Sequence, residues 1–329
     1  MKKTVMKTAA ITAPAVLAAL FALALTALTA ALIACPNPSG GDDQSGDGGS
    51  GGGGPSGEVW VVSTLAGNGH SGYADGTGAA AEFEWPTGIT MDTSGNIYVA
   101  DQSDHRIRTI TPSGVVSTLA GNGSSGDTNG TGTAAQFYSP HDVAVDSAGT
   151  VYVADLYNAL IRQITPEGVV STLAGSGSYG YAEGTSTEAQ FYSPAGVAVD
   201  SAGTVYVGDS YNDRIRQITP EGMVSTLAGS GSYGYTDGTG LTAKFKNPEG
   251  VAVDSAGNVY VADTQNHCIR RITSEGVVTT LAGSTKGYTD GIGTAAKLTW
   301  PNGVAVNSAG TVIYVTDWYN HCIRKLTRQ

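Results

Sequence analysis

The sequence predicts an all-β fold, namely a single β-propeller of four-stranded antiparallel blades. The first observation is a period of 54 residues, since Leu-Ala-Gly begins at Leu65, Leu119, Leu173, Leu227 and Leu281. The second is that each copy holds four short segments rich in Val, Ile and Tyr, separated by turns of Gly, Pro, Asp and Ser. No segment has a helical period beyond one turn in stretches such as "GTGAAAEF". A four-stranded unit repeated in this way is typical of a propeller.

The two ends of the repeat region, residues 58–329, complement each other. The region begins with "EVWVVSTLAG", which matches the fourth strand of the other copies, and ends with "CIRKLTRQ", after a third strand. We therefore expect five blades, with the N-terminal strand closing the last blade and leaving no unpaired major edge. A six-bladed ring and an open ring are the alternatives.

Residues 1–34 have the layout of a signal peptide, with three lysines followed by a long apolar run. The run ends in "LIAC", which resembles the bacterial lipobox and implies lipidation of Cys35. Residues 35–57 continue as a Gly/Ser/Asp-rich flexible linker. We expect an exported, lipid-anchored protein of the bacterial cell envelope, periplasmic or surface-exposed. A retained signal anchor and ordinary signal-peptide cleavage are the alternatives, because the run is long enough to span a bilayer.

The charge balance excludes some classes of partner. The chain has a formal net charge of −11, and the first 34 residues contribute three lysines and no acid. An acidic body argues against binding nucleic acid, and against membrane contact other than through the lipid anchor. We expect a monomer. The repeat region contains neither G-x-S-x-G nor H-E-x-x-H, so enzymatic activity is not indicated, although it stays open.

The blades carry a family resemblance. The stretches "VYVADLYNALIRQI", "VYVGDSYNDRIRQI" and "VYVADTQNHCIRRI" resemble the NHL repeat, with its Asp, its Asn three residues later and its Ile-Arg. The resemblance covers all five copies and implies a propeller. It is broad for function, because NHL propellers serve as binding platforms and, in some relatives, as enzymes. Familiar NHL rings often have six blades, whereas this chain supplies five.

Several recurring residues are predicted to be structural. An Asp ends the second strand of every copy and an Arg follows seven residues later, so we expect the two to pair or to bond nearby backbone; they are Asp101, Asp155, Asp209, Asp263 and Asp317, and Arg108, Arg162, Arg216, Arg270 and Arg324. His105, His267 and His321 share one repeat position, which on different blades is too spread out for one zinc ion. The "YxDGxG" segments, such as Tyr73 to Gly78, suit a tight turn with its Tyr against the neighbouring blade, or else a calcium or sugar contact.

The pairs that follow the Pro of each copy are the candidate channel-mouth site. Four of the five pairs end in Gly, as expected where backbones crowd an axis or need positive φ. The first members vary, and with the exceptional His-Asp pair they give a candidate ligand or metal site of Thr87, His141, Asp142, Glu249 and Asn302. This mix suits a divalent metal, Ca²⁺ or Zn²⁺, or a general base. In the structural alternative, Asp142 replaces Gly because Asp tolerates left-handed backbone, and His141 fills space.

The loops that join the second and third strands vary between blades. They carry aromatic residues suited to contact with a partner, namely Tyr157, Tyr211, Trp318 and Tyr319. The sequence therefore favours a non-catalytic binding module for a protein or glycan at the envelope. The alternative function is a metal-assisted lyase or hydrolase acting at the channel mouth.

Overall fold

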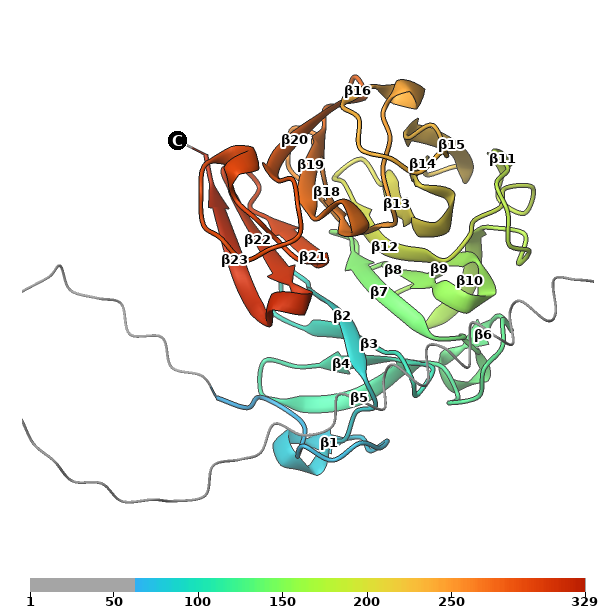
Figure 1. Cartoon of the computed structure of the whole chain (residues 1–329). Coiled ribbons are helices and arrows are strands. Elements are labelled where there is room, and N and C mark those ends of the chain that lie inside the picture. The colour runs from blue at the N-terminus through green and yellow to red at the C-terminus, as the bar shows by residue number, and fades with distance from the viewer. Residues whose placement is uncertain (1–62, 329) are drawn as a thin grey trace, which may run out of the picture. The chain divides into compact units, whose positions relative to one another are not determined.

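The computed structural model describes residues 63–328, which form five antiparallel β-sheets arranged as the blades of a propeller (Figure 1). The all-β, five-bladed architecture is thus confirmed. The predicted signal peptide, Cys35, the linker and the start of the first predicted strand lie outside the described residues. No helix among residues 63–328 is long and apolar enough to cross a membrane.

Blades 1 to 4 share one topology. From the axis outward, blade 1 holds β2 (Pro86–Met91), β3 (Ile97–Asp101), β4 (Arg106–Ile110), β5 (Val115–Ala120) and β1 (Gly76–Thr77). Blade 2 holds β7 (Pro140–Val145), β8 (Val151–Asp155), β9 (Leu160–Ile164), β10 (Val169–Ala174) and β6 (Gly130–Thr131). The outermost two-residue strand is an addition to the predicted four, because part of each Gly-rich loop pairs with the fourth strand of its own blade.

The later blades repeat this order up to the C-terminus. Blade 3 holds β12 (Pro194–Val199), β13 (Val205–Asp209), β14 (Arg214–Ile218), β15 (Met223–Ala228) and β11 (Gly184–Thr185). Blade 4 holds β17 (Pro248–Val253), β18 (Val259–Asp263), β19 (Cys268–Ile272), β20 (Val277–Gly283) and β16 (Gly238–Thr239). Blade 5 has three strands in the described residues, β21 (Pro301–Val306), β22 (Val312–Asp317) and β23 (Cys322–Thr327).

Short 3₁₀ turns are the helical elements of the described chain. One set includes the predicted turn before the next repeat: η1 (Gly78–Ala80), η2 (Gly132–Ala134), η5 (Gly240–Thr242) and η7 (Gly293–Ala295). A second set forms the joining loops between second and third strands: η3 (Leu156–Asn158), η4 (Ser210–Asn212), η6 (Thr264–Asn266) and η8 (Trp318–Asn320).

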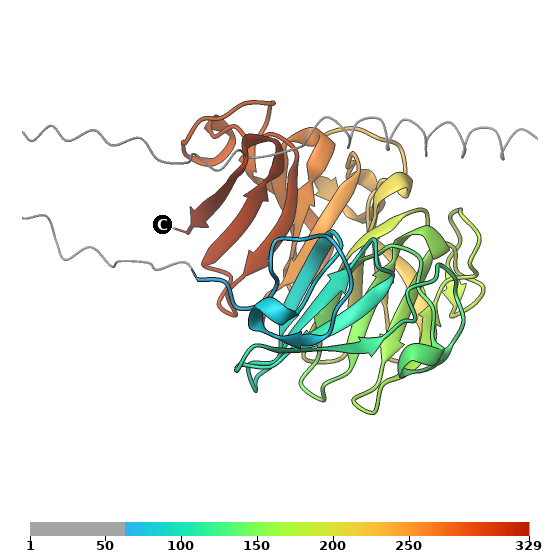
Figure 2. The ribbon, with the colours of Figure 1, turned by 90° about the horizontal axis from the view of Figure 1, so that it is seen from below.

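The innermost strands pack against one another in the order β2, β7, β12, β17 and β21, as Figures 1 and 2 show. The first strand of each blade therefore lies at the axis, as predicted. Alternate residues of a second strand face different blades. On β8, Val151 and Val153 join the core shared with blade 1, whereas Tyr152 and Ala154 join the core shared with blade 3. This two-sided burial explains why "VYVAD" is almost wholly apolar.

The two ends of the blade series are less covered. Among the described residues, β23 has no fourth strand beside it, and a cavity of about 740 Å³ lies along it, lined in part by Ile292 and Gly293. Ile89 on β2 is 65% exposed and Ile323 on β23 is 67% exposed. The predicted closing segment runs from Glu58 to Gly67, and its first half lies outside the described residues. Its second half, Ser63 to Gly67, forms no strand, so closure of the ring stays a prediction.

Candidate functional site

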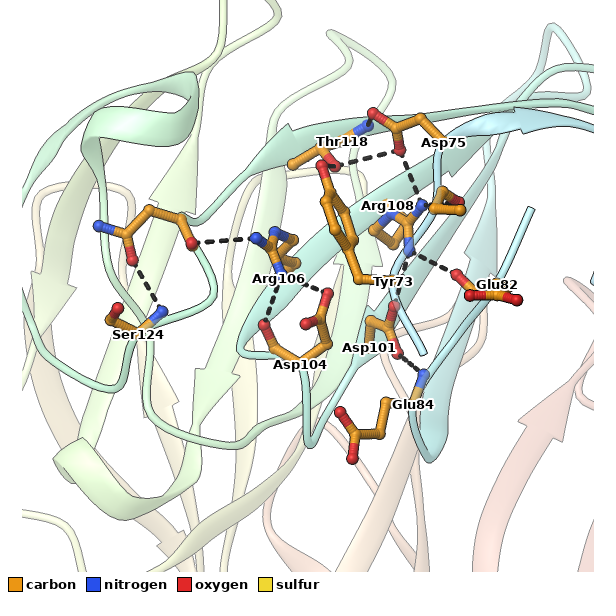
Figure 3. A network of polar contacts seen from close by, with 12 residues as sticks. Tyr73, Asp75, Glu82, Glu84, Asp101, Asp104, Arg106, Arg108, Thr118 and Ser124 are labelled. Carbon is orange, nitrogen blue, oxygen red and sulfur yellow. Dashed lines mark hydrogen bonds and ion pairs between the residues drawn. The ribbon is translucent and has the colours of Figure 1, made fainter. Parts of the chain in front are cut away.

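The recurring Asp and Arg form a buried ion pair that organises each blade. In blade 1, Arg108 donates to Asp101 at 2.8 Å, and Asp101 also accepts from the backbone N–H of Glu84 at 2.7 Å (Figure 3). Both side chains are fully buried in blades 1 to 4. The Arg also donates to backbone carbonyls of the Gly-rich loop, as Arg108 does to Ala74. The predicted structural role is confirmed.

The "YxDGxG" segments are held by the same network. Tyr73 lies over the Arg106 guanidinium at 3.6 Å, and its hydroxyl is 3.1 Å from Thr118 Oγ1. Asp75 accepts from Arg108 and from the backbone N–H of Thr118 (Figure 3). The expectation that this Tyr packs on the neighbouring blade was wrong, because the loop pairs with the fourth strand of its own blade. Tyr73 and Asp75 thus both contact the strands of their own blade, and the alternative of a calcium or sugar contact stays a prediction.

The shared histidine position ends the joining loop in left-handed backbone. His105, His267 and His321 have φ near 55°, as do Ala159 and Asp213 at the same repeat position. Nδ1 of His105 accepts from the backbone N–H of Ser139 in blade 2 at 3.1 Å, and His267 accepts from Trp300 in blade 5 at 3.2 Å. Burial lowers the pKa of His105 and His267, which favours the neutral ring. His105 and His267 thus link successive blades.

At the channel mouth, His141 and Asp142 bond to blade 3 and not to each other. His141 Nδ1 donates to the carbonyl of Ala195 at 2.9 Å. Asp142 accepts from the N–H of Val197 at 3.0 Å and from its neighbour Val143 at 2.9 Å. Burial lowers the pKa of His141 and raises the pKa of Asp142 to about 7. The pair therefore ties blade 2 to blade 3.

Close approach, and not positive φ, explains the Gly in blades 1, 3 and 4. A Cβ on Gly88 would lie 2.4 Å from Asp142 Cα, and one on Gly196 would lie 2.2 Å from the carbonyl oxygen of Glu249. None of Gly88, Gly196 and Gly250 has a positive φ, and neither does Asp142. The explanation that Asp142 adopts left-handed backbone was therefore wrong.

The remaining mouth residues also contact the next blade. Thr87 donates to the carbonyl of His141 at 2.8 Å, and Asn302 donates to the Glu249 carboxylate. Burial raises the pKa of Glu249 to about 7. Within residues 63–328, no three His, Cys, Asp or Glu side chains are grouped so as to hold a metal ion. Each of the five predicted mouth residues thus contacts a neighbouring blade, and their role as a ligand site stays a prediction.

The joining loops share one backbone hydrogen bond. In each blade, a joining-loop residue donates its N–H to the leading residue, which lies two positions before the Pro of the first strand; the pairs are Ser103–Glu84, Tyr157–Tyr138, Tyr211–Tyr192, Gln265–Lys246 and Tyr319–Thr299. Each bond measures 3.1 or 3.2 Å. The predicted loop aromatics therefore stand on a constant scaffold, at the end of the blades where the chain approaches the first strand.

Sequence reasoning missed several aromatic neighbours of these loops. The rings of Tyr138 and Tyr157 lie 5.1 Å apart, as do those of Tyr192 and Tyr211. In blade 5, Trp300 stacks on Trp318 at 6.0 Å and contacts Tyr319. Tyr138 and Tyr192 were hidden in the repeated "FYSP", which looked like scaffold. The signal that reveals them is the change of the leading residue between blades.

Comparison with known proteins identifies the repeat unit. Five segments match the NHL repeat: residues 83–110, 137–164, 191–218, 245–272 and 298–326. The chain contains five NHL repeats. Each matched segment runs from near the end of a Gly-rich loop through the first three strands of an NHL blade.

Curated relatives cover the propeller but are longer proteins. The chain is 31% identical over 284 residues to SUPPRESSOR OF QUENCHING 1 of Arabidopsis thaliana, a match that spans 80% of this chain and 27% of that protein. It is 29% identical over 308 residues to human NHL repeat-containing protein 2, spanning 81% and 42% respectively. The chain thus spans less than half the length of these relatives.

Solved structures share the fold. An auxiliary nutrient binding protein from Bacteroides ovatus superposes with a TM-score of 0.53 at 20% identity, covering 81% of this chain and 76% of that one. A chain of a nidogen/laminin complex gives a TM-score of 0.52 at 19% identity, covering 74% and 75%. At this identity the likeness concerns the propeller architecture alone.

Proposed function

We propose that this protein is an exported lipoprotein of the bacterial cell envelope whose NHL propeller is a non-catalytic binding module for a protein or glycan. The observation that carries the proposal is the set of exposed aromatic side chains on one end of the blades. Tyr211 is 50% exposed, Trp318 54% and Tyr319 56%. Their loops are held by backbone hydrogen bonds to the segments that lead into the first strands. Exposed aromatic rings held on ordered loops are typical of binding surfaces.

The channel-mouth geometry gives less support to a lyase or hydrolase. His141, Asp142 and Glu249 all have partners in neighbouring residues or blades, and no hydrogen bond joins His141 to Asp142 among the described residues. A general base paired with a carboxylate, or a set of three metal ligands, would favour catalysis. The Bacteroides propeller described as nutrient binding is consistent with a binding role for this fold, but that description concerns the other protein.

The binding role is tested by recovery of partners from the native envelope with the full-length protein as bait. The variant Tyr157→Ala/Tyr211→Ala/Trp318→Ala/Tyr319→Ala is expected to lose the partners that the wild type recovers. The matched control is Ser103→Ala/Gln265→Ala, which changes the same loop position in blades without aromatics. Equal recovery by all three proteins would contradict the proposed surface.

The anchor is tested by fractionation. Cys35→Ser removes the thiol that would carry the lipid, so we expect the protein to leave the membrane fraction. Continued retention of the variant in that fraction would contradict lipidation and favour an uncleaved apolar helix.

A further inference from the structure

We propose that a row of five tyrosines on blades 2 and 3 binds a neutral polysaccharide with a repeating unit. The row comprises Tyr138, Tyr157, Tyr179, Tyr192 and Tyr211. This inference rests on the proposed binding function and names its ligand class. It is carried by the continuity of the row, its independence of the fold, its repetition and, within residues 63–328, the absence of Arg or Lys cation–π contacts on its rings.

The row is continuous across two blades. Tyr138 packs edge-on against Tyr157 in blade 2, with ring centroids 5.1 Å apart. Tyr179, from the Gly-rich loop that leads into blade 3, donates its hydroxyl to the Tyr157 carbonyl at 2.7 Å and places its ring 5.3 Å from Tyr192. Tyr192 then contacts Tyr211 at 5.1 Å. Four of the rings remain 40% to 52% exposed, and Tyr157 is partly buried.

The fold does not require these aromatic side chains. The backbone bond beneath each tyrosine pair also forms in blade 1 with Ser103 and Glu84, and in blade 4 with Gln265 and Lys246. The Tyr179 position is occupied by Ser125 in the loop of blade 2 and by Lys286 in that of blade 5, each in the same bridge to the following segment. The same backbone bonds and bridges therefore form with polar side chains at these positions, so the tyrosine rings are available for another role.

The row is also periodic. Tyr138 and Tyr192 are 54 residues apart, as are Tyr157 and Tyr211, and the two ring pairs have the same centroid distance. Successive blades thus present the same pair of rings twice. A surface that repeats one pair of rings suits a ligand that repeats one unit, as a polysaccharide does, better than the irregular surface of a globular protein.

The chemistry of the row suits a neutral, hydroxyl-rich ligand. Among the described residues, the cation–π contacts of Arg and Lys fall on other aromatic rings, such as Tyr233 beneath Lys246 and Tyr319 beneath Lys286. The carboxylates of Asp155 and Asp209 accept from the backbone N–H groups of Tyr138 and Tyr192. Burial, and to a lesser extent the charge of Glu249, raises the pKa of Tyr211. Because no Arg or Lys of residues 63–328 lies over these five rings, we expect a neutral polysaccharide to bind better than an acidic one.

The hydroxyl groups complete the match. In the described part of the chain, Tyr179 alone in the row uses its hydroxyl in a bond to the protein. The other four hydroxyls are free to donate to or accept from a ligand. A tyrosine with an exposed ring and a free hydroxyl offers an apolar face and a polar tip side by side. Sugars have the same alternation of C–H faces and hydroxyl edges.

The test is affinity electrophoresis of the full-length protein in detergent, with neutral polysaccharides of gluco-, galacto-, manno- and arabino-type backbone as probes. We expect at least one to retard the wild type and polygalacturonate not to do so. Tyr157→Ala/Tyr211→Ala is expected to weaken binding about tenfold or more, because two stacking rings are lost. Tyr157→Phe/Tyr211→Phe keeps the rings and is expected to bind between wild type and the Ala variant. Thermal unfolding of each variant checks the fold.

Controls separate this inference from the broader function. Ser103→Ala/Gln265→Ala should bind like the wild type, and Glu84→Tyr/Ser103→Tyr, which extends the row into blade 1, should bind more tightly. The inference is overturned if no neutral probe retards the wild type, or if the Ala variant binds equally well. If an envelope protein is instead captured in a tyrosine-dependent way without any polysaccharide binding, the glycan assignment fails while the binding module stands.

Discussion

Ile269 and Ile323 occupy the same repeat position, yet Ile269 is fully buried and Ile323 is 67% exposed. Ile269 belongs to a core that blades 4 and 5 share. Equivalent cores lie between blades 1 and 2, between blades 2 and 3, and between blades 3 and 4. At the other end, Ile89 of blade 1 is 65% exposed, whereas its counterpart Val251 is 5% exposed. The two end faces thus carry the same apolar residues as the interfaces between blades, but in the described part of the chain no neighbouring blade covers them.

The difference shows that a blade does not bury its own apolar surface. Each face is covered by the next blade, so stability is shared between neighbours, as in other repeat proteins. Blade 1 is capped on its free side by a small cluster in which Ala66 packs near Phe83 and Val116. We therefore expect the apolar faces of blades 1 and 5 to be stabilised when another β-sheet surface packs on them, as a neighbouring blade does on each inner blade.

The polar network indicates the register that the predicted closing strand would take. In blade 1, Asp75 accepts from the N–H of Thr118 on the fourth strand, and Asp237 does the same with Thr280 in blade 4. In blade 5 the equivalent Asp290 side chain is 97% exposed. The residue that stands 54 positions before Thr118 is Thr64. We therefore expect Thr64 to meet Asp290 if the N-terminal strand closes the last blade.

The largest effect is expected from breaking an ion pair in an inner blade. Arg216→Ala leaves the fully buried Asp209 without its cation and should lower the free energy of unfolding by about 3–5 kcal/mol. Arg324→Ala, at the same position in blade 5, should cost half of that or less, because the Arg324 side chain is 11% exposed in an uncovered blade. Urea denaturation followed by circular dichroism measures both, and equal losses would contradict the comparison.

The next effect concerns the predicted closing strand. Val62 corresponds to Val116, Val170, Val224 and Val278, which are all buried, whereas Val61 corresponds to residues that are about two-fifths exposed. Val62→Ala should therefore cost about 2 kcal/mol, as Val224→Ala should, and Val61→Ala should cost little. Denaturant midpoints test this. An unchanged midpoint for Val62→Ala would mean that residues 58–64 do not complete blade 5.

Much of this architecture could be predicted from the sequence, because the repeat imposes it five times. The strand order, the axial first strands and the structural Asp–Arg pairs all follow from residues that recur in step. The mouth site was less predictable. The sequence shows that His141, Asp142 and Glu249 are exceptional, but whether such side chains converge or bond across blades depends on spacings between blades that no local pattern encodes.

The tyrosine row shows that sequence comparison can also overlook residues that belong together in space. Tyr157 and Tyr211 were predicted because their loops vary, whereas Tyr138 and Tyr192 were overlooked because "FYSP" recurs in two adjacent blades. Tyr179 joins the row through a bond to the carbonyl of Tyr157 in another blade. Contacts between segments from different repeats require the structure.

A smaller effect is expected at the left-handed loop position. His267→Ala removes the acceptor for the backbone N–H of Trp300 and should cost about 1 kcal/mol. His321→Ala is the matched control, since in the described residues no blade follows blade 5 to supply such a donor. Thermal unfolding compares the two. A similar loss in both variants would instead indicate that His321 accepts from a backbone N–H of its own. Trp85 of blade 1 would be the expected donor, because it holds the repeat position of Trp300.

The smallest effect is a change in pH dependence at the boundary of blades 2 and 3. Burial raises the pKa of Asp142 to about 7 from the ordinary 3.8. Below about pH 4 the carboxyl is protonated in both folded and unfolded chains. Between pH 4 and 7 the folded chain holds the proton that the unfolded chain has lost, so the contribution of Asp142 to stability falls as pH rises.

Asp142→Asn removes that contribution, so the stability difference between wild type and variant should decline from pH 4 to 7 and then level off. Because Asp142 is only partly buried, solvent should make the decline modest. Denaturation at several pH values measures it, and Asp92→Asn serves as a control, because the pKa of Asp92 is lowered by its hydrogen bonds with Asn96. A flat difference for Asp142→Asn would mean that water reaches this carboxylate freely and that the contact with Val197 does not seal the boundary.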